Sequence, residues 1–325
     1  MDFAFTFSLA LLALVIEAVA GYSETLYRLI GHPVTWMGAL IGWLDHWLNR
    51  ESDEPETRLA LGGVTLVIAL AAAIGVSLYL VSLFPEGLIG TVVIAILAST
   101  LLAQRSLYRH VATVAKALDA GGVTAGRGAV AQIVGRDPEA LDEAGVARAA
   151  IESLAENFSD AVIAPAFWIA IFGLAGGVAY KAANTADSMI GHRTPRYAEF
   201  GKAAARFDDL VNLPASRLSA AFLCLAGFFL PGASAAKALQ AVSFDARRHR
   251  SPNAGWPEAA MAGALDLALA GPRRYHGVIV PDDWIGAGRA RAEPADLRRA
   301  LALFALACVL AAALMILAVG VLVQL

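Results

Sequence analysis

Residues 59–84 read LALGGVTLVIALAAAIGVSLYLVSLF, a run of 26 residues that contains no charged side chain. A helix needs roughly 20 predominantly apolar residues to cross the hydrocarbon core of a bilayer. Three other apolar runs, at residues 3–20, 88–103 and 300–322, approach or exceed that length, and Pro85-Glu86-Gly87 forms a tight turn before the second of these. The chain is therefore expected to be a polytopic, all-α integral membrane protein.

The composition of the 325-residue chain points the same way. The chain is 58% hydrophobic and only 16% charged, whereas about a quarter of the residues in a soluble domain are charged. A net charge of −3 argues against a nucleic-acid partner. No basic residue precedes the run 3–20, so it is expected to be a retained helix rather than a cleaved signal peptide.

Two further apolar stretches are ambiguous. Residues 161–179 are interrupted by Pro165 and several glycines, and residues 218–230 form a stretch of only 13 residues. Segments of this kind are often re-entrant or buried rather than spanning. The polar segments 104–159, 181–217 and 237–299 are expected to form amphipathic helices, broken at Gly121-Gly122, with a helix that starts from an Asp137 N-cap and Pro138. No window alternates at period two, so residues 1–325 are expected to form one integrated helical domain.

Charge predicts the topology. The three polar segments carry 6, 6 and 10 Lys and Arg residues, whereas the turn at residues 85–87 carries none. The positive-inside rule therefore places all three segments in the cytoplasm. If both ambiguous stretches crossed fully, residues 181–217 would face the opposite side. We expect that neither stretch crosses fully, or that both line a water-accessible cavity within the protein.

Carboxylates and amides near hydrocarbon are costly to desolvate, so they usually persist because a site needs them. On a helix, Glu152, Glu156 and Asp160 recur at i, i+4 and i+8 along one face, with Asn157 beside Glu156. Like charges in such a row repel, and a cation would remove the penalty. A solvated helix face just before the membrane explains the same pattern.

A second group of polar residues follows within 60 residues. Asn184 and Asp187 lie three residues apart, and Asp208 and Asp209 lie within one helical turn of Asn212. Arg193, Arg206 and Arg217 lie near these residues in the sequence. Asp and Asn groups for a divalent metal, with Arg for phosphate, are typical of a nucleotide or phosphoryl-transfer site. Ordinary helix ion pairs would explain any one of these clusters, but the set favours a site.

A turn-rich segment, Ser251-Pro-Asn253-Ala-Gly255-Trp256-Pro257-Glu258, follows Arg247, Arg248 and Arg250. Its backbone N–H groups, with the upstream arginines, could cradle an anion. Alternatively, the segment is a loop that caps a helix starting at Pro257.

With these residues the chain resembles the CobD/CbiB family of cobalamin biosynthesis, the adenosylcobinamide-phosphate synthases. The matching motifs begin with His32-Pro33-Val34, Gly135-Arg136-Asp137, Glu152-Ser153, Glu156-Asn157, Asp160 and Ala164-Pro165. They continue with Tyr180-Lys181, Asn184-Thr185, Asp187-Ser188-Met189-Ile190-Gly191, Gly201, Ala205-Arg206, Asp208-Asp209, Asn212, Ser251-Pro252-Asn253 and residues 255–263.

The resemblance implies a ligase of the cell inner membrane whose active site faces the cytoplasm. It would use ATP to join the propionate carboxylate of adenosylcobyric acid to the amine of (R)-1-amino-2-propanol phosphate, or of a related amino-alcohol, giving adenosylcobinamide phosphate. Mg²⁺ would be the cofactor. Its expected partners are the corrinoid, the amino-alcohol phosphate and the lipid bilayer. A second copy of the chain or other membrane enzymes of cobalamin assembly are further possible partners.

Residue roles carried over by the resemblance form three sets. The expected metal ligands are Asp208, Asp209, Glu156, Asp187 and Asn212. The expected substrate- and phosphate-binding residues are Arg206, Arg193, Arg217, Asn184, Ser251, Asn253, Lys181 and Arg136. The expected catalytic residues are Asp160, as the base that deprotonates the attacking ammonium, with Glu152 and Asn157.

Two departures from the family pattern weaken individual roles. Residues 17–24 read EAVAGYSE where family members commonly carry Gly-Asp-Pro, and the proline in the segment Asn212-Leu-Pro214-Ala-Ser-Arg217 is shifted. Two other readings of the chain are a corrinoid-binding membrane transporter and a non-catalytic signalling relative. A transporter predicts polar residues inside its spanning helices, whereas here the spans are clean and the polar residues cluster between them.

Overall fold

The computed structural model describes residues 2–22, 25, 28–29, 31–134, 138–275, 278–280 and 282–324, and only the backbone of residues 273–275 and 278–280. Its contacts divide the chain into two compact units. Unit 1 comprises Met1–Ala103, Ala164–Asn212 and Met315–Leu325, and unit 2 comprises Gln104–Ile163 and Leu213–Leu314. Each unit is therefore built from segments that are far apart in the sequence.

Six helical stretches among the described residues are long and apolar enough to cross a membrane. They are Phe3–Ala20, Pro55–Ser82, Leu88–Val130, Glu143–Ile190, Lys202–Phe229 and Pro294–Leu322. This confirms the expectation of an all-α, polytopic membrane protein.

The two ambiguous stretches fall inside these helices. Residues 161–179 lie within Glu143–Ile190, and residues 218–230 lie almost wholly within the 28-residue helix Lys202–Phe229. The apolar stretch 218–230 is short because the first half of its helix, from Lys202, is polar and hydropathy does not reveal it. Incomplete crossing of the two stretches remains a prediction. It now rests on the positive-inside rule, because the helices themselves are long enough to span.

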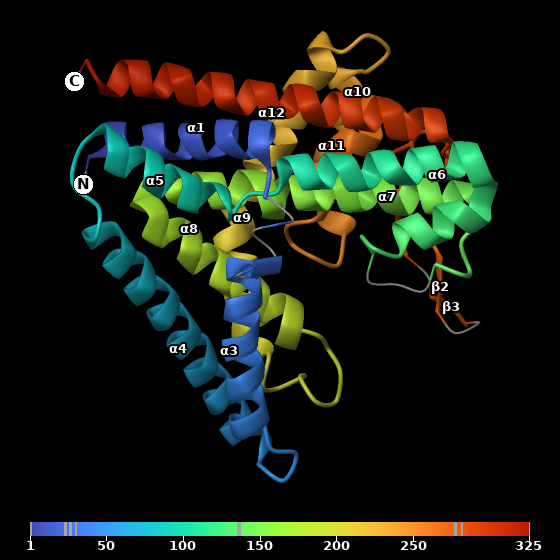
Figure 1. Cartoon of the computed structure of the whole chain (residues 1–325). Helices are drawn as coiled ribbons and strands as arrows, with labels where there is room; N and C mark the ends of the chain where they lie inside the picture. Colours follow the sequence, from blue (N-terminus) through green and yellow to red (C-terminus); the bar gives the residue numbers. More distant parts are fainter. Residues whose placement is uncertain are drawn as a thin grey trace. The chain divides into compact units, whose positions relative to one another are not determined.

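Unit 1 is organised around one central helix. The helices α1 (Phe3–Ala20), α3 (Pro33–Leu48), α4 (Pro55–Ser82) and α5 (Leu88–Ser99) all pack against α8 (Ala164–Ile190) (Figure 1). Thr6 fastens α1 to α8 by donating its hydroxyl to the carbonyl of Ala170 at 2.7 Å. From the turn at residues 85–87, α4 and α5 diverge (Figure 1).

A compact apolar cluster lies where α3, α4 and α8 meet the start of α9 (Lys202–Phe229). Ile41, Leu66, Ile190 and Phe200 belong to it and are nearly inaccessible to solvent. Gly62 of α4 allows the closest approach, because a Cβ at this position would overlap the carbonyl of Phe200. This packing fixes the end of α8 and the loop that follows it.

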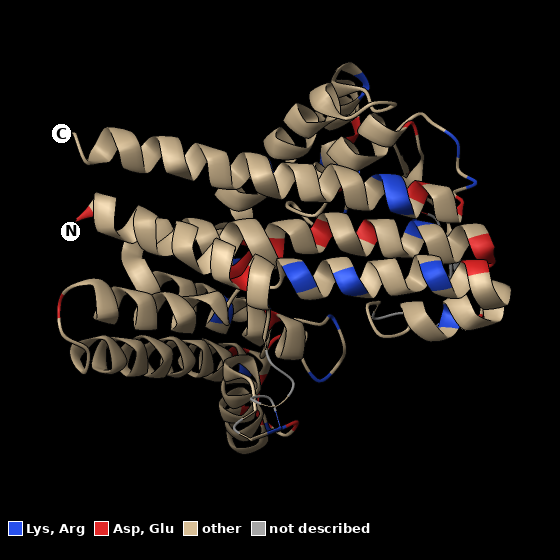
Figure 2. Cartoon of the chain, turned by 45° about the horizontal axis from the view of Figure 1, so that its top comes forward, with Lys and Arg blue, Asp and Glu red and all other residues tan. Residues whose placement is uncertain are grey.

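Unit 2 contains the amphipathic helices that the sequence predicted. The helices α6 (Gln104–Val130) and α7 (Glu143–Phe158) lie side by side, and Lys, Arg, Asp and Glu residues gather along them (Figures 1 and 2). The predicted break at Gly121-Gly122 is confirmed as a kink in α6, where Gly122 has a φ of 62°.

The rest of unit 2 packs around α7. A single π-helical turn, η1 (Ser159–Ile163), follows α7, and α11 (Gly255–Leu265) packs against both α7 and α10 (Ala235–Asp245). The 3₁₀ turn η2 (Ala246–Arg248) and α12 (Pro294–Leu322) complete the helices. The sequence did not predict the two short strand pairs, β1 (Leu269–Ala270) with β4 (Trp284–Ile285) and β2 (Arg273–Tyr275) with β3 (Val278–Val280).

The predicted helix start at Pro138 is wrong. The helix α7 begins at Glu143, and its N-cap is Asp142, whose side chain accepts a hydrogen bond from Gly145 N at 2.7 Å. Pro138 and Glu139 lie in the preceding turn, which Arg127 holds by donating to the carbonyl of Leu141 at 2.8 Å. Asp137 lies outside the described residues. Asp137 and Asp142 are both suitable N-cap residues by sequence, and Asp142 is the one that caps α7.

The start of α12 is fixed by one buried carboxylate. Asp296 is 1% exposed and accepts hydrogen bonds from Arg289 at 2.6 Å, from Arg299 at 3.1 Å and from Glu293 N at 2.9 Å. A carboxylate in the first turn of a helix also interacts favourably with the helix dipole.

We expect Asp296→Ala to destabilise the protein by about 3 kcal/mol, because it strands two arginines and removes the acceptor of a helix N-terminus. Unfolding of the detergent-solubilised protein would measure this. The matched control is Asp119→Ala, which breaks the exposed Asp119–Arg298 pair at 2.7 Å and should cost no more than about 1 kcal/mol. Equal losses in the two variants would contradict a structural role for Asp296.

Candidate functional site

A chain of hydrogen bonds in unit 1 joins α8 to the start of α9. Tyr180, Asn184 and Asp187 recur at intervals of four and three residues and so share a face of α8, and Lys181 lies three residues before Asn184. Lys181 Nζ donates to Asn184 Oδ1 at 3.5 Å, and Asn184 Nδ2 donates to Asp208 Oδ1 at 3.4 Å. The sequence-predicted residues Lys181, Asn184 and Asp208 therefore meet in space.

The other oxygen of Asp208 is held from its own helix. Asn212 Nδ2 donates to Asp208 Oδ2 at 2.9 Å and to the Asp208 carbonyl at 3.2 Å. The Tyr180 hydroxyl donates to Asn212 Oδ1 at 2.9 Å, which fixes the amide of Asn212. Asn212 was predicted as a metal ligand, but its amide orients Asp208 in this arrangement. Tyr180 belongs to a motif that matches the family, but its spacing alone predicts no role for it.

Two further carboxylates interact with Asp208, and two basic side chains interact with those carboxylates. Asp187 interacts electrostatically with both Asp208 and Asp209. Asp209 is close enough to Arg193 to be stabilised by its charge, and Asp187 is similarly affected by His192. Asp208 is only 8% exposed. Repulsion among partly buried carboxylates is costly, and a bound cation would relieve it.

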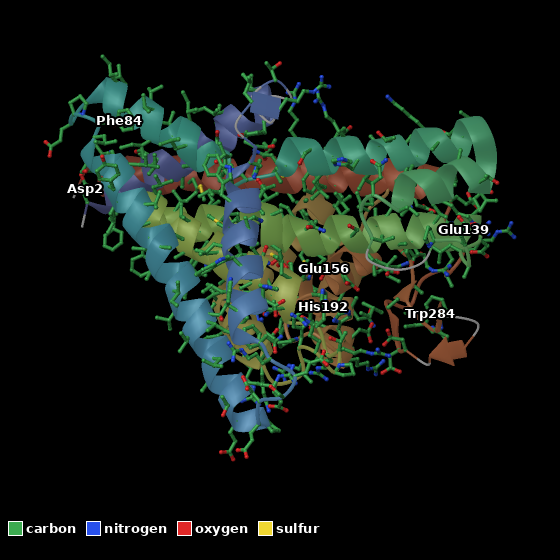
Figure 3. All side chains as sticks on the ribbon, turned by 60° about the horizontal axis from the view of Figure 1, so that its bottom comes forward. Asp2, Phe84, Glu139, Glu156, His192 and Trp284 are labelled. Atoms are coloured by element: carbon green, nitrogen blue, oxygen red, sulfur yellow. The ribbon has the colours of Figure 1, made fainter. Side chains whose placement is uncertain are left out.

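A glycine leaves room for the carboxylate of Asp187. Gly191 ends α8, and its N–H donates to the Asp187 carbonyl at 2.7 Å. A Cβ at Gly191 would overlap Asp187 Oδ1. The motif Asp187-Ser-Met-Ile-Gly191 therefore allows the carboxylate to fold back over the helix end. His192 and Arg193 follow directly and are exposed (His192 is labelled in Figure 3).

The loop that carries His192 and Arg193 is clamped to α3 and α4. Arg196 Nη2 donates to Asp45 Oδ2 at 2.9 Å, and Asn49 Nδ2 donates to Asp45 Oδ1 at 2.8 Å. Asn49 and Arg58 also donate to the carbonyl of Arg196. The hydrogen bond to Asp45 raises the pKa of the Arg196 guanidinium. No motif in the sequence marks Asp45, Asn49, Arg58 or Arg196.

A separate polar cluster in unit 2 involves the end of the family pattern. Arg217 Nη1 donates to Asn253 Oδ1 and to Ser216 Oγ, both at 2.8 Å, and its guanidinium lies 4.5 Å from the centre of the Trp256 ring. The predicted residues Arg217 and Asn253 are therefore in direct contact. Arg247 places a second positive charge near Arg217.

The loop before α11 uses several of the amides that were expected to bind an anion. Ser251 Oγ accepts hydrogen bonds from the N–H groups of Asn253 and Ala254, both at 3.2 Å. The N–H of Ser251 donates to His249 Nδ1 at 3.0 Å. The helix begins at Gly255, two residues before the predicted Pro257. Arg217 and Arg247 thus remain as the more suitable anion-binding groups of this cluster.

The acidic row on α7 does not form one uniform face. Glu152 is buried, and its Oε1 accepts a hydrogen bond at 3.0 Å from the N–H of Ala270, a residue with a φ of 56°. Glu156 is exposed (labelled in Figure 3), and Asp160 lies in η1, where the π-helical turn alters the i+4 register. Asn157 Nδ2 donates to the Ser153 carbonyl at 2.9 Å. Glu152 thus has a structural contact that the sequence did not predict.

The remaining predicted residues are placed as follows. Arg206 is an exposed residue of α9, and Arg136 lies outside the described residues. Among the residues that the structure describes, no three His, Cys, Asp or Glu side chains are grouped so as to hold a metal ion. Mg²⁺ is usually held by one or two carboxylates together with substrate phosphates. Asp208, with Asp187 or Asp209, would supply such a pair of carboxylates.

The fold and the buried carboxylate–amide cluster define the class of protein: a multi-pass helical membrane protein with a polar site on its helices. The CobD/Cbib protein family model matches residues 10–304. The chain belongs to the CobD/CbiB family.

Its relatives include proteins named cobalamin biosynthesis protein CobD. The one from Sinorhizobium fredii is 50% identical over 310 residues, 94% of this chain and 95% of the relative. The one from Rhodobacter capsulatus is 50% identical over 309 residues, 94% of this chain and 93% of the relative. The one from Brucella suis is 48% identical over 297 residues, 90% of each chain. These relatives support a role in cobalamin biosynthesis. No solved structure matches the chain.

We expect Asp45→Asn to loosen the loop at residues 191–201, because it removes the charge that pairs with Arg196. Breaking this charge-assisted hydrogen bond should lower the free energy of local opening by about 2 kcal/mol. Hydrogen–deuterium exchange of peptides from this loop would measure the change. The matched control is Glu199→Gln, which removes the partly exposed Glu199–Lys202 pair at 3.3 Å in the same loop. Equal exchange in wild type and Asp45→Asn would contradict the clamp.

The N-cap formed by His32 should make the stability of the protein depend on pH. Its Nδ1 accepts from Val34 N at 3.2 Å and caps α3, and both burial and the charge of Lys181 lower the pKa of its imidazole. The cap is therefore present above the ordinary His pKa of about 6.5 and is lost as pH falls through the lower folded-state value. Below about pH 6, wild type should lose about 1 kcal/mol of stability relative to His32→Asn, which keeps an acceptor and does not titrate. Identical pH profiles of the two unfolding midpoints would contradict this.

Proposed function

We propose that the protein is an ATP-dependent amide ligase that makes adenosylcobinamide phosphate in cobalamin biosynthesis. Its substrates would be adenosylcobyric acid and (R)-1-amino-2-propanol phosphate or a related amino-alcohol. The observation that best supports the proposal is the buried Asp208 carboxylate, held by Asn184 and Asn212 and surrounded by Asp187, Asp209, Lys181 and Arg193. The membership of the CobD/CbiB family supports the choice of substrates.

The chemistry requires activation of a carboxylate. A carboxylate does not react with an amine at a useful rate, so the corrinoid propionate would first attack the γ-phosphorus of ATP, giving an acyl phosphate and ADP. The neutral amine would then attack the acyl carbon and expel inorganic phosphate. The amine nitrogen loses a proton before it attacks and another as the amide forms, so a general base is needed.

The residues near Asp208 suit the first step. Asp208, with Asp187 or Asp209, would hold Mg²⁺, which supplies charge neutralisation on the triphosphate. Asn184 and Asn212 would keep Asp208 oriented, and Tyr180 would keep Asn212 oriented. Lys181 and Arg193 would stabilise the negative charge that develops on the transferred phosphoryl group.

Arg217 and Asn253 are proposed to bind a substrate phosphate. The guanidinium of Arg217 lies against the Trp256 ring and donates to Asn253. These two contacts fix the plane of the guanidinium before a phosphate binds. Asp160 remains the proposed base, and Arg206 and Glu156 remain candidates for contacts with the nucleotide. We also propose that the site opens to the cytoplasm and that the protein resides in the inner membrane, since the basic segments carry the site residues.

The test is purified protein in detergent with ATP, Mg²⁺, adenosylcobyric acid and aminopropanol phosphate, with the amide product detected by mass spectrometry. We expect Asp208→Asn to lower the rate about 100-fold or more, because it removes a charge that is needed in the transition state. Asp119→Asn, at an exposed ion pair, should be as active as wild type. No amide product with folded wild type, or an unchanged rate in Asp208→Asn, would overturn the assignment.

A further inference from the structure

A cavity of about 340 Å³ lies within unit 1, between α3, α4, α5 and α8. Its walls are largely alanine, valine, leucine and isoleucine side chains, among them Ala73, Val76, Ile96 and Leu174. The volume falls within the range of small-molecule sites, and the lining is more apolar than such sites usually are.

The hydroxyl groups of the lining are already used. Ser77 donates to the carbonyl of Ile74 at 2.8 Å, Thr100 to that of Leu97 at 2.7 Å, and Tyr22 to that of Gly31 at 2.7 Å. A buried water needs two to four polar partners, which these walls do not offer. The cavity therefore suits a hydrocarbon occupant.

The cavity opens to the outer surface of the apolar helices. Trp36, Val76 and Ile96 line it, yet 54%, 59% and 50% of their surfaces are exposed. The helix α4 and the stretch that begins with α5 are both candidate membrane spans, and they diverge from the turn that joins them (Figure 1). An opening between spanning helices faces lipid rather than water, so an acyl chain can enter sideways.

A positive charge lies near one end of the cavity. Leu174 and Val178 line the cavity on α8, and Lys181 lies on the same helix face one turn further on. Pro33 and Tyr22 also line it, the ring of Tyr22 contacts that of His32 at 4.5 Å, and His32 senses the charge of Lys181. The helix spacing and the electrostatic effect on His32 thus both place Lys181 near this end.

We propose that the cavity is a lipid site, in which an acyl chain of an anionic glycerophospholipid fills the apolar space and its phosphate pairs with Lys181. The bilayer supplies the ligand. Because Lys181 Nζ also contacts Asn184 at 3.5 Å, the headgroup would lie next to the hydrogen-bonded chain that holds Asp208. Lys181 is also the residue proposed above to stabilise the transferred phosphoryl group, and the three N–H donors of its ammonium allow contact with both phosphates. The lipid site is tested without substrates, so its outcome is separate from the reaction.

The test uses the full chain in phosphatidylcholine nanodiscs that contain a small fraction of phosphatidylglycerol with a diazirine on its acyl chain. After irradiation, we expect cross-links in peptides from α4, α5 and α8. Ala73→Trp should fill the cavity and reduce labelling about tenfold, equivalent to a tenfold loss of affinity. Its matched control is Ala71→Trp, an exposed position on α4 that is not among the lining residues. Equal labelling of the two variants would overturn the site.

Headgroup choice is tested by competition. Unlabelled phosphatidylglycerol should reduce labelling of wild type more strongly than phosphatidylcholine or diacylglycerol, and Lys181→Gln should abolish that difference. Equal competition by the three lipids in wild type would overturn the pairing with phosphate. If Ala73→Trp fails to fold, Ile96→Trp fills the same space from α5 and replaces it, with the unfolding midpoint as the check on folding.

Discussion

The carboxylate of Asp208 is buried in a protein with few charged residues, and amides on α8 and α9 hold it in place. Each of its oxygens accepts a hydrogen bond from an amide, one from Asn184 on α8 and one from Asn212 on its own helix. An amide donates without adding a net charge. The carboxylate is therefore oriented by groups that carry no charge of their own, and a bound cation would stabilise its ionised form.

Neutral groups form the hydrogen bonds around Asp208, and cationic groups lie beyond them. The inner contacts are the neutral groups of Asn184, Asn212 and Tyr180, and the cationic groups of Lys181 and Arg193 lie further out. Arg193 is carried by a loop whose position depends on Asp45 of α3. A substrate that brings both a metal ion and phosphates would complement such an arrangement, because the metal satisfies the inner carboxylates and the phosphates satisfy the outer cations.

The features that depend on local sequence were predictable. The length and hydropathy of residues 59–84 define a spanning helix without reference to the rest of the chain, and Gly122 alone accounts for the kink in α6. Asn184, Asp187 and Asp208 could be grouped because the polar clusters that contain them lie within 60 residues of one another. The cap of α7 was misplaced because Asp137 and Asp142 carry equivalent local signals.

The features that depend on distant contacts were not predictable. Asp45 and Arg196 are 151 residues apart and each belongs to a segment that is unremarkable in isolation. The hydrogen bond from Tyr180 to Asn212 and the contact of Glu152 with Ala270 depend on packing that no periodicity describes. The π-helical turn at Ser159 also has no simple sequence signal, although it separates Asp160 from the register of Glu156.

The division of the chain bears on how the protein can be made. The polypeptide leaves unit 1 after Ala103, returns to it at Ala164, leaves again after Asn212 and returns once more at Met315. No continuous fragment consists of one unit alone, so neither unit can be expressed by itself through truncation. During synthesis, unit 1 would wait for α8 and α9 to emerge from the ribosome, long after α1 and α4 have been made.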